Sequence, residues 1–288
     1  MRVGVVFPQT EIGGDPEGIR HFAEQVEALG FQHLLAFDHV LGADRSVHTD
    51  WDRAYDVDSP FHEPLTLFAY LAGVTTSLEF VSGVVILPQR QTVLVAKQAA
   101  QVDVLSGGRL RLGVGLGWNR VEYEALGEDF TNRGKRSEEQ IELLRALWTQ
   151  RSVTFDGRFH RVTGAGIAPL PVQRPIPLWV GPTSAEVGFR RAGRLADGWF
   201  AQVQPGPELD ERRAIVAQAA REAGRDPDSL GFEGRVPWRG DRQQVVDDLD
   251  RWAEAGATHV SINTIGAGFE TVDQHLAALS EVAPQSVA

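Results

Sequence analysis

Residues 78–118 read LEFVSGVVILPQRQTVLVAKQAAQVDVLSGGRLRLGVGLGW and contain two apolar strand patterns separated by a helical pattern. The two apolar segments, residues 78–87 and 109–114, are rich in β-branched side chains, which favour strands. Residues 92–105 between them have the spacing of a helix. A strand, a crossover helix and a second strand form the unit from which parallel sheets are built.

The same unit recurs along the chain. Strands are expected at residues 2–7, 33–38, 78–87, 109–114, 176–180, 198–202, 230–236 and 259–264. Helices are expected at residues 16–29, 64–76, 92–105, 137–148, 184–195, 208–223, 242–255 and 271–282. Eight such pairs in 288 residues predict a single α/β domain over residues 1–288, a (β/α)8 TIM barrel, with an open doubly wound sheet as the alternative.

Three segments are longer than ordinary connections and are read as insertions. Residues 39–63 follow the second strand and residues 116–136 follow the fourth, so both lie at the end of the barrel where enzymes of this fold build their sites. Residues 150–175 precede the fifth strand and contain a hairpin turn at Phe155-Asp156-Gly157. Because this third insertion connects a helix to the next strand, it is expected at the opposite end of the barrel.

Composition narrows the function. The formal net charge is −11, from 28 Lys and Arg against 39 Asp and Glu, which argues against a nucleic-acid partner. Cysteine is absent, so disulfides, thiolate catalysis and Cys-ligated metals are excluded, and the histidines lack metal-binding spacing. No 18-residue apolar run and no signal-peptide cleavage site is found. We therefore expect a cytoplasmic enzyme that acts on a small-molecule substrate, without a metal and away from membranes.

Polar and glycine-rich motifs gather at the predicted strand ends. Asp38-His39 closes the second strand, where an imidazole could donate or accept a proton. Ser82-Gly83-Val84 interrupts the third strand, which indicates a bulge, a close ligand or a simple kink. The glycines of residues 113–117 end the fourth strand beside Trp118; their spacing does not fit a dinucleotide fingerprint, and bare backbone there would let a flat ligand approach.

Two further motifs allow both a structural and a binding interpretation. Residues 181–184, Gly-Pro-Thr-Ser, join the fifth strand to its helix and could bind a phosphate or simply cap the helix. Residues 133–136, Arg-Gly-Lys-Arg, form the densest basic cluster of this acidic chain. They are read as a solvated helix start, or as a site that attracts an anionic cofactor tail.

An ordered series of motifs resembles the luciferase-like monooxygenase superfamily, especially its branch that uses the deazaflavin coenzyme F420. With Asp38-His39 and the C-terminal βα units the likeness spans nearly the whole chain. The motifs include Glu63-Pro64-Leu65-Thr66, Ser82-Gly83-Val84, Asp103-Val104-Leu105-Ser106-Gly107-Gly108-Arg109, Leu112-Gly113-Val114-Gly115-Leu116-Gly117-Trp118, Pro177-Leu178-Trp179-Val180-Gly181 and Ala196-Asp197-Gly198-Trp199.

The resemblance implies a barrel with a deazaflavin or flavin in its mouth and a non-prolyl cis peptide under the ring, here Gly83–Val84. It implies that His39 handles the proton. The expected cofactor contacts are Asp38, Ser82, Gly83, Val84, Gly115, Gly117, Trp118, Gly181, Pro182, Thr183 and Ser184. The expected substrate contacts are Phe7, Trp51 and Trp118, with Trp51 and Tyr55 on a rim loop that could act as a lid.

The sequence departs from the family pattern at two places. Pro182 replaces a glycine and removes one amide donor from the phosphate turn. The sugar-phosphate dehydrogenase branch carries a carboxylate where this chain has Trp118, and a tryptophan where it has Gly42 or Ala43, which argues against sugar-phosphate oxidation.

The preferred hypothesis is an oxidoreductase that transfers hydride between coenzyme F420 and a small organic substrate, assembled as a homodimer. The alternatives are a monooxygenase that uses reduced FMN and dioxygen, and a non-catalytic flavin-binding protein.

Overall fold

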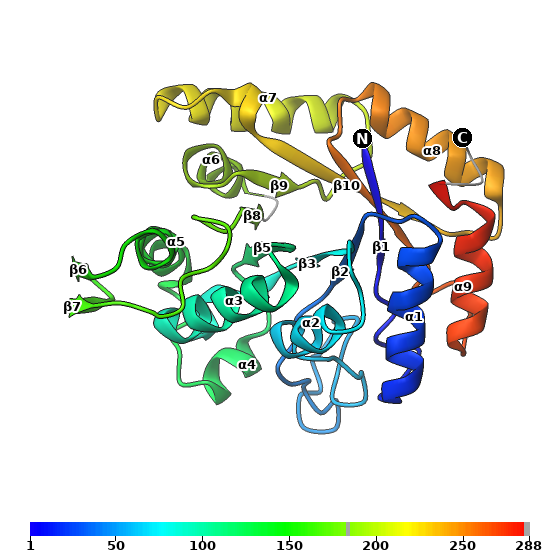
Figure 1. Ribbon diagram of the computed structural model, residues 1–288, viewed down its shortest axis with the longest axis horizontal. Helices are drawn as coiled ribbons and strands as arrows, with labels where there is room; N and C mark the ends of the chain where they lie inside the picture. The colour runs from blue at the N-terminus through cyan, green and yellow to red at the C-terminus, as the bar shows by residue number, and fades with distance from the viewer. Residues whose placement is uncertain (183–184, 285–288) are drawn as a thin grey trace.

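The structure, a computed structural model that describes residues 1–182 and 185–284, contains a closed barrel of eight parallel strands, the third of them split in two (Figure 1). The order around the barrel is β1, β2, β3 with β4, β5, β8, β9, β10 and β11, and β11 pairs with β1. The strands are β1 Arg2–Val6, β2 His33–Ala36, β3 Glu79–Ser82, β4 Val85–Ile86, β5 Leu110–Gly115, β8 Leu178–Gly181, β9 Gly198–Phe200, β10 Gly231–Pro237 and β11 His259–Asn263. The predicted (β/α)8 fold is confirmed.

Helices surround the strands, as Figure 1 shows. They are α1 Pro16–Ala28, α2 Pro64–Ala72, α3 Thr92–Ser106, α4 Arg120–Ala125, α5 Arg133–Thr149, α6 Glu186–Leu195, α7 Pro207–Glu222, α8 Arg242–Glu254 and α9 Val272–Glu281. Local sequence sets their ends: Asp15 caps α1 through the backbone N–H groups of Glu17 and Gly18, with Pro16 in the first turn. Gly107 ends α3 at a φ of +69°, a left-handed conformation that glycine adopts without steric cost.

The third barrel strand is interrupted where the sequence predicts. β3 ends at Ser82, the Gly83–Val84 peptide is cis, and β4 resumes at Val85 before a 3₁₀ turn at Leu87–Gln89. Residues 78–87 therefore form two short strands and the start of a turn, where the sequence pattern gives one strand. At the break, the Ser82 Oγ donates a hydrogen bond to the Gly113 carbonyl (2.8 Å) and accepts one from the Gly113 N–H (2.9 Å). The hydroxyl thus links the interrupted strand to β5 in place of backbone hydrogen bonds.

The insertion after the fourth predicted strand is more helical than expected. It contains α4, which was not predicted from the sequence, and α5 begins at Arg133, four residues earlier than expected. Asn119 caps α4 by accepting from the N–H groups of Val121 and Glu122. The basic cluster at 133–136 therefore forms the first turn of a helix, with Arg136 paired to Glu128.

The insertion before the fifth predicted strand contains the expected hairpin. Its strands are β6 Val153–Asp156 and β7 Arg161–Ala165. His160 at the turn bonds Thr92 of α3 (2.8 Å) and Glu139 of α5 (2.7 Å). The hairpin therefore lies along the outside of α3 and α5 (Figure 1). A later part of the insertion reaches the expected, opposite end of the barrel, where Gln173 bonds Asp103 near the end of α3 and the carbonyl of Leu110 at the start of β5.

The lower interior of the barrel, toward the N-terminal ends of the strands, holds a buried ionic cluster. Arg111 of β5 pairs with Glu233 of β10 (2.6 Å) and with Glu79 of β3 (3.1 Å). Glu233 also accepts hydrogen bonds from Ser261 and from the His33 ring. Burial alone would raise the pKa of Glu233, but Arg111 and His33 hold it far below its usual value. We call Arg111, Glu233, Glu79, His33 and Ser261 the lower cluster.

No helix within the described ranges 1–182 and 185–284 is long and apolar enough to cross a membrane.

Candidate active site

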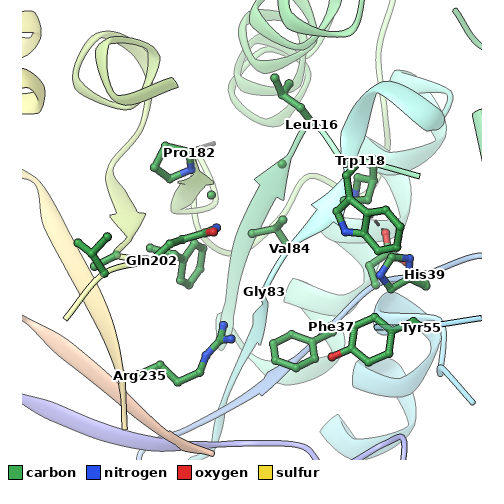
Figure 2. Close-up of a pocket in the computed structure, with 18 of the residues that line it drawn as sticks. Phe37, His39, Tyr55, Gly83, Val84, Leu116, Trp118, Pro182, Gln202 and Arg235 are labelled. Atoms are coloured by element: carbon green, nitrogen blue, oxygen red, sulfur yellow. Dashed lines mark hydrogen bonds between the residues drawn. The ribbon is translucent and has the colours of Figure 1, made fainter. Parts of the chain in front are cut away.

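A cavity of about 570 Å³ opens at the C-terminal ends of the barrel strands, within the size range of small-molecule sites (Figure 2). Its walls come from the ends of β2, the β3–β4 break, β5, β8, β9 and β10, and from Tyr55 of the rim loop. This is the end of the barrel at which enzymes of this architecture place their chemistry.

One wall of the cavity is built around Val84. A Cβ added to Gly115 would collide with a Val84 methyl group, and one added to Gly181 would meet the other methyl at 3.0 Å. The glycines of β5 and β8 therefore leave room for the Val84 side chain. This side chain occupies the space next to the glycines in which the sequence pattern had suggested a flat ligand. The Val84 methyls, rather than bare backbone, face the cavity as a small apolar platform.

Gly117 continues the same wall. Its φ of +68° favours glycine, and an added Cβ would lie 2.6 Å from Ile86 of β4. This turn brings Trp118 to the cavity mouth, where 37% of the residue is exposed. Gly83, Val84, Gly115, Gly117, Trp118, Gly181 and Pro182 all line the cavity, so the structure brings these sequence-predicted residues together.

His39 lies next to Trp118 at the mouth (Figure 2) and is held by a carboxylate. Its Nδ1 lies 3.0 Å from Oε1 of Glu122 in α4, and Glu122 is 1% exposed in its side chain. The same oxygen accepts the backbone N–H of Val40 (2.9 Å), while Oε2 accepts from Gln89 (3.1 Å). His39 Nε2 has no hydrogen-bond partner in the described part of the chain and remains available to a ligand.

Glu122 carries a negative charge at neutral pH. Burial alone would raise its pKa, but hydrogen bonds from His39, Gln89 and the Leu41 backbone hold the pKa below the usual value. An ionised Glu122 accepts a hydrogen bond from the Nδ1–H group of His39. The other ring nitrogen, Nε2, is therefore the atom that can gain or lose a proton. The tautomer follows from this contact.

Aromatic side chains enclose the His39 ring. Its centroid lies 4.7 Å from that of Phe61, 5.5 Å from that of Tyr55 and 5.2 Å from that of Trp118. Trp51 lies 5.6 Å from Trp118 and donates its indole N–H to the Tyr55 carbonyl (2.8 Å). The rim loop therefore packs over the mouth, although Trp51 itself does not line the main cavity.

Two predicted cofactor contacts have their polar atoms committed to the fold. Asp38 lies in the wall, but its Oδ2 accepts the Ile86 N–H (3.0 Å) and its Oδ1 accepts from Arg90 (2.9 Å). Burial raises the pKa of Asp38, and Arg90 partly opposes this. Ser82 is fully buried, bonds Gly113 and does not line the cavity. Both side chains hold the β3–β4 break in place.

Three further predicted residues are placed outside the cavity or outside the described chain. Phe7 is fully buried in the hydrophobic core, with its ring edge-on to Phe22 (5.6 Å) and His62 (5.8 Å), and is not among the lining residues. Substrate contact through Phe7 is therefore not carried forward. Thr183 and Ser184 lie outside the described residues.

Several residues of the site were not predicted from the sequence. Arg235 carries charge into the cavity, and Glu122 bonds His39 without lining the cavity itself. Phe37 adds an aromatic surface beneath the Arg235 guanidinium, 4.8 Å from ring centroid to Cζ. A signal for Arg235 was available: Glu233 and Arg235 alternate with Gly234 and Val236 in a predicted strand, and alternate side chains share one face. Two charged side chains on the inward face of a strand are unusual unless they form ion pairs or bind a ligand.

The cavity fits a planar redox ring. Val84 offers a flat apolar surface on one side, and His39 and Tyr55 offer polar atoms on the other (Figure 2). Within the described ranges no group of three or more His, Asp or Glu side chains could hold a metal ion. Pro182 lines the cavity and offers no backbone N–H there.

The sequence model described as "Luciferase-like monooxygenase" matches residues 1–278. An uncharacterised protein of Mycobacterium tuberculosis is 37% identical over 208 residues, 70% of this chain and 71% of that protein. An F420-dependent glucose-6-phosphate dehydrogenase of Nocardia farcinica is 32% identical over 209 residues, 68% of this chain and 61% of the enzyme. An FMNH2-dependent dimethylsulfone monooxygenase of Pseudomonas putida is 31% identical over 184 residues, 63% and 47% of the two chains.

Solved structures share the fold. An F420-dependent secondary alcohol dehydrogenase, solved with an F420–acetone adduct, superposes with a TM-score of 0.80 at 18% identity and covers 99% of this chain and 98% of its own. An EDTA monooxygenase of Chelativorans superposes with a TM-score of 0.82 at 16% identity and covers 100% of this chain and 93% of its own. At these identities the likeness concerns the fold alone.

Proposed function

Because the chain belongs to the luciferase-like monooxygenase family, we propose that it is an oxidoreductase that transfers hydride between coenzyme F420 and a small organic substrate. The observation that carries the proposal is the pairing, across one cavity, of the Val84 platform with the His39–Glu122 pair. Relatives that use F420 and relatives that use FMN support the redox class. The choice of F420 is our own inference from the ordered motifs of the sequence.

The protein side of the reaction divides into support and proton transfer. Val84, seated on Gly115 and Gly181, supports one face of the ring, and Trp118 covers the mouth. The bound deazaflavin supplies the carbon that accepts or releases hydride. His39 Nε2 takes the proton that leaves a substrate hydroxyl during oxidation, or returns it to a carbonyl oxygen during reduction.

Glu122 positions His39 for this transfer. Its carboxylate fixes the Nδ1–H tautomer and stabilises the charged imidazolium that forms when Nε2 accepts a proton. The aromatic rings of Phe61, Tyr55 and Trp118 restrict the motion of the His39 imidazole and shield it from water. The shielding strengthens the electrostatic interaction between His39 and Glu122.

A second candidate is a monooxygenase that uses reduced FMN and dioxygen. The 31% identity to the Pseudomonas putida dimethylsulfone monooxygenase favours it. It would use the same platform and the same histidine, but dioxygen would be consumed.

Equilibrium binding of coenzyme F420 and of FMN to the purified protein tests the proposal. We expect dissociation constants in the micromolar range for F420 and at least tenfold weaker binding of FMN. Tighter binding of FMN, together with dioxygen uptake in the presence of its reduced form, would overturn the proposal in favour of the monooxygenase. Tight binding without any oxidation or reduction of acceptors would indicate a carrier protein.

A further inference from the structure

One cation in the cavity forms no ion pair with any described residue. Arg235 extends from β10 into the space below Val84, as Figure 2 shows. Its guanidinium forms no hydrogen bond and no ion pair with any residue in the ranges 1–182 and 185–284; its contact is the face of Phe37. The nearest acid on its own strand, Glu233, is taken up by Arg111, Ser261 and His33 in the lower cluster.

A buried charge without an ion pair destabilises the folded protein unless a charged ligand binds to it. Burial lowers the pKa of Arg235, and the charge of Glu233 opposes this only in part. A guanidinium remains charged in proteins and presents five N–H donors in a planar fork. An unpaired charge at the edge of a protein interior is retained where an anionic partner binds.

The groups around Arg235 define the shape of that partner. Tyr55 lies in the same cavity, burial raises its pKa so that its hydroxyl remains a donor, and this hydroxyl has no hydrogen-bond partner in the described chain. Figure 2 shows Phe37 and Tyr55 between Arg235 and His39. A ligand that reaches both Arg235 and His39 must therefore cross an aromatic surface.

The charge balance selects a monoanion. Of the lining residues that the structure describes, Arg235 is the one Lys or Arg, and the one carboxylate, Asp38, is already bonded to Arg90. A single guanidinium with one nearby hydroxyl matches the two oxygens of a carboxylate, whereas a phosphate dianion would leave charge and acceptors unpaired.

We propose that Arg235, with Tyr55, forms a subsite for the carboxylate of an organic substrate whose reacting carbon lies at His39. The proposal rests on the proposed function for the identity of the reaction, but the subsite itself can be measured without it. The substrate class is a carboxylic acid in which an apolar or aromatic segment separates the carboxylate from the carbon that is oxidised or reduced.

Calorimetric titration with matched pairs of acids and amides tests the subsite. The probes are propanoate, benzoate and 2-naphthoate, each compared with its neutral amide, in low-chloride buffer because chloride competes for the guanidinium. In the wild-type protein we expect at least one acid to bind about 10- to 100-fold more tightly than its amide, the difference typical of a charge-assisted hydrogen bond in a partly buried site.

Two variants locate the effect. Arg235→Gln should reduce the acid-to-amide ratio to about one, while Arg239→Gln, which removes the same charge at an exposed position four residues further on, should leave the ratio unchanged. A wild-type ratio of one for all three pairs, or a ratio that persists in Arg235→Gln, would overturn the proposal. Because the guanidinium forms no hydrogen bond or ion pair within the described residues and contacts only the Phe37 ring there, Arg235→Gln should unfold at nearly the same temperature as wild type or at a higher one. A clear fall would indicate a structural role instead.

Titrations of these variants with acids and with cofactors distinguish failure of the carboxylate subsite from failure of the proposed hydride-transfer function. If Arg235→Gln weakens binding of reduced F420 or FMN tenfold and no acid preference exists, then the arginine serves the charge of the cofactor and the substrate subsite is refuted. If wild type binds neither cofactor, the proposed reaction fails while the acid preference of the empty cavity is still measured directly.

Discussion

The barrel contains two sets of charged side chains, one above the other, and they are built in opposite ways. In the lower cluster Arg111 is 2% exposed and bonds both Glu79 and Glu233. In the cavity Arg235 bonds no carboxylate of the described chain, and His39 keeps one ring nitrogen free. Both arginines face inward and both rest on an aromatic ring, Trp179 for Arg111 and Phe37 for Arg235.

The difference separates charges that hold the barrel together from charges that meet a ligand. A pair closed on itself contributes to the uniqueness of the fold and offers nothing to a substrate. Atoms left free at the C-terminal ends of the strands are disfavoured in the empty protein and become useful when a ligand binds. Substitutions in the lower cluster should therefore change stability, and substitutions in the cavity should change turnover or binding.

The largest effect is expected from His39→Ala. Loss of the proton-transfer group should reduce turnover by about 10²- to 10⁴-fold, while the dissociation constant of the cofactor changes less than about threefold. Steady-state kinetics and equilibrium binding measure the two quantities. His48→Ala, on the same loop but outside the cavity lining, serves as the control. Full turnover in His39→Ala would remove this residue from the mechanism.

Arg111→Met should have the next largest effect, and on stability. It leaves Glu233 buried without its main partner, at a cost of about 3–5 kcal/mol in the free energy of unfolding. Urea denaturation measures this quantity. Arg161→Met, which removes an exposed pair with Asp156, should cost less than about 1 kcal/mol. Equal effects of the two substitutions would contradict the structural role of the lower cluster.

Acidification should destabilise the folded protein, in part through His259 at the lower end of the barrel. Burial, with Arg111 nearby, lowers the pKa of His259 to about 3, so between that value and about 6.5 the unfolded chain binds one more proton than the folded one. Stability should fall as pH drops through this window, by at most about 1.4 kcal/mol per pH unit for this group. Glu233, whose folded pKa is depressed, adds a further loss below about 4.5.

His259→Phe keeps the ring contact with Trp179 and removes the titration. The slope of unfolding free energy against pH between 4.5 and 6.5 should decrease in this variant. An unchanged slope would assign the acid sensitivity to other groups.

Glu122→Gln should have the smallest effect. The amide oxygen introduced by this substitution can still accept from His39. The new amide N–H can donate to Oε1 of Gln89, which has no partner among the described residues, once the Gln89 amide turns over. The fold should therefore tolerate the change, while the loss of the negative charge reduces turnover about tenfold.

A pH–rate profile distinguishes the loss of charge in Glu122→Gln from a change in packing. The acid limb that reports ionisation of Glu122, whose pKa lies below its usual value, should be missing from the profile of this variant, because an amide does not titrate. A profile with the same acid limb as wild type would leave Glu122 with a packing role alone.

The fold was largely predictable because it depends on local patterns. Eight strand–helix alternations, the cap at Asp15 and the break at Gly83 are each written in a few consecutive residues. The course of the hairpin formed by β6 and β7 was not predictable, because His160 bonds Thr92 and Glu139, which lie far from it in the sequence.

The site was predictable only in part, for the same reason. His39 and the rim glycines stand out locally, whereas the partner of His39 lies 83 residues further on, in a helix that was not expected. Asp38 and Ser82 looked like ligands because polar residues at strand ends often bind, yet their atoms are used by Ile86, Arg90 and Gly113. Which atoms remain free depends on geometry that no spacing rule supplies.

The seat of Val84 has a consequence for engineering. Its methyl groups fill the places where Gly115 and Gly181 would otherwise carry side chains, so a side chain added at either glycine, or a larger one at Val84, would create a steric clash. Libraries aimed at new substrate ranges should therefore leave this trio fixed and diversify Phe37, Tyr55 and Arg235, whose side chains line the open cavity.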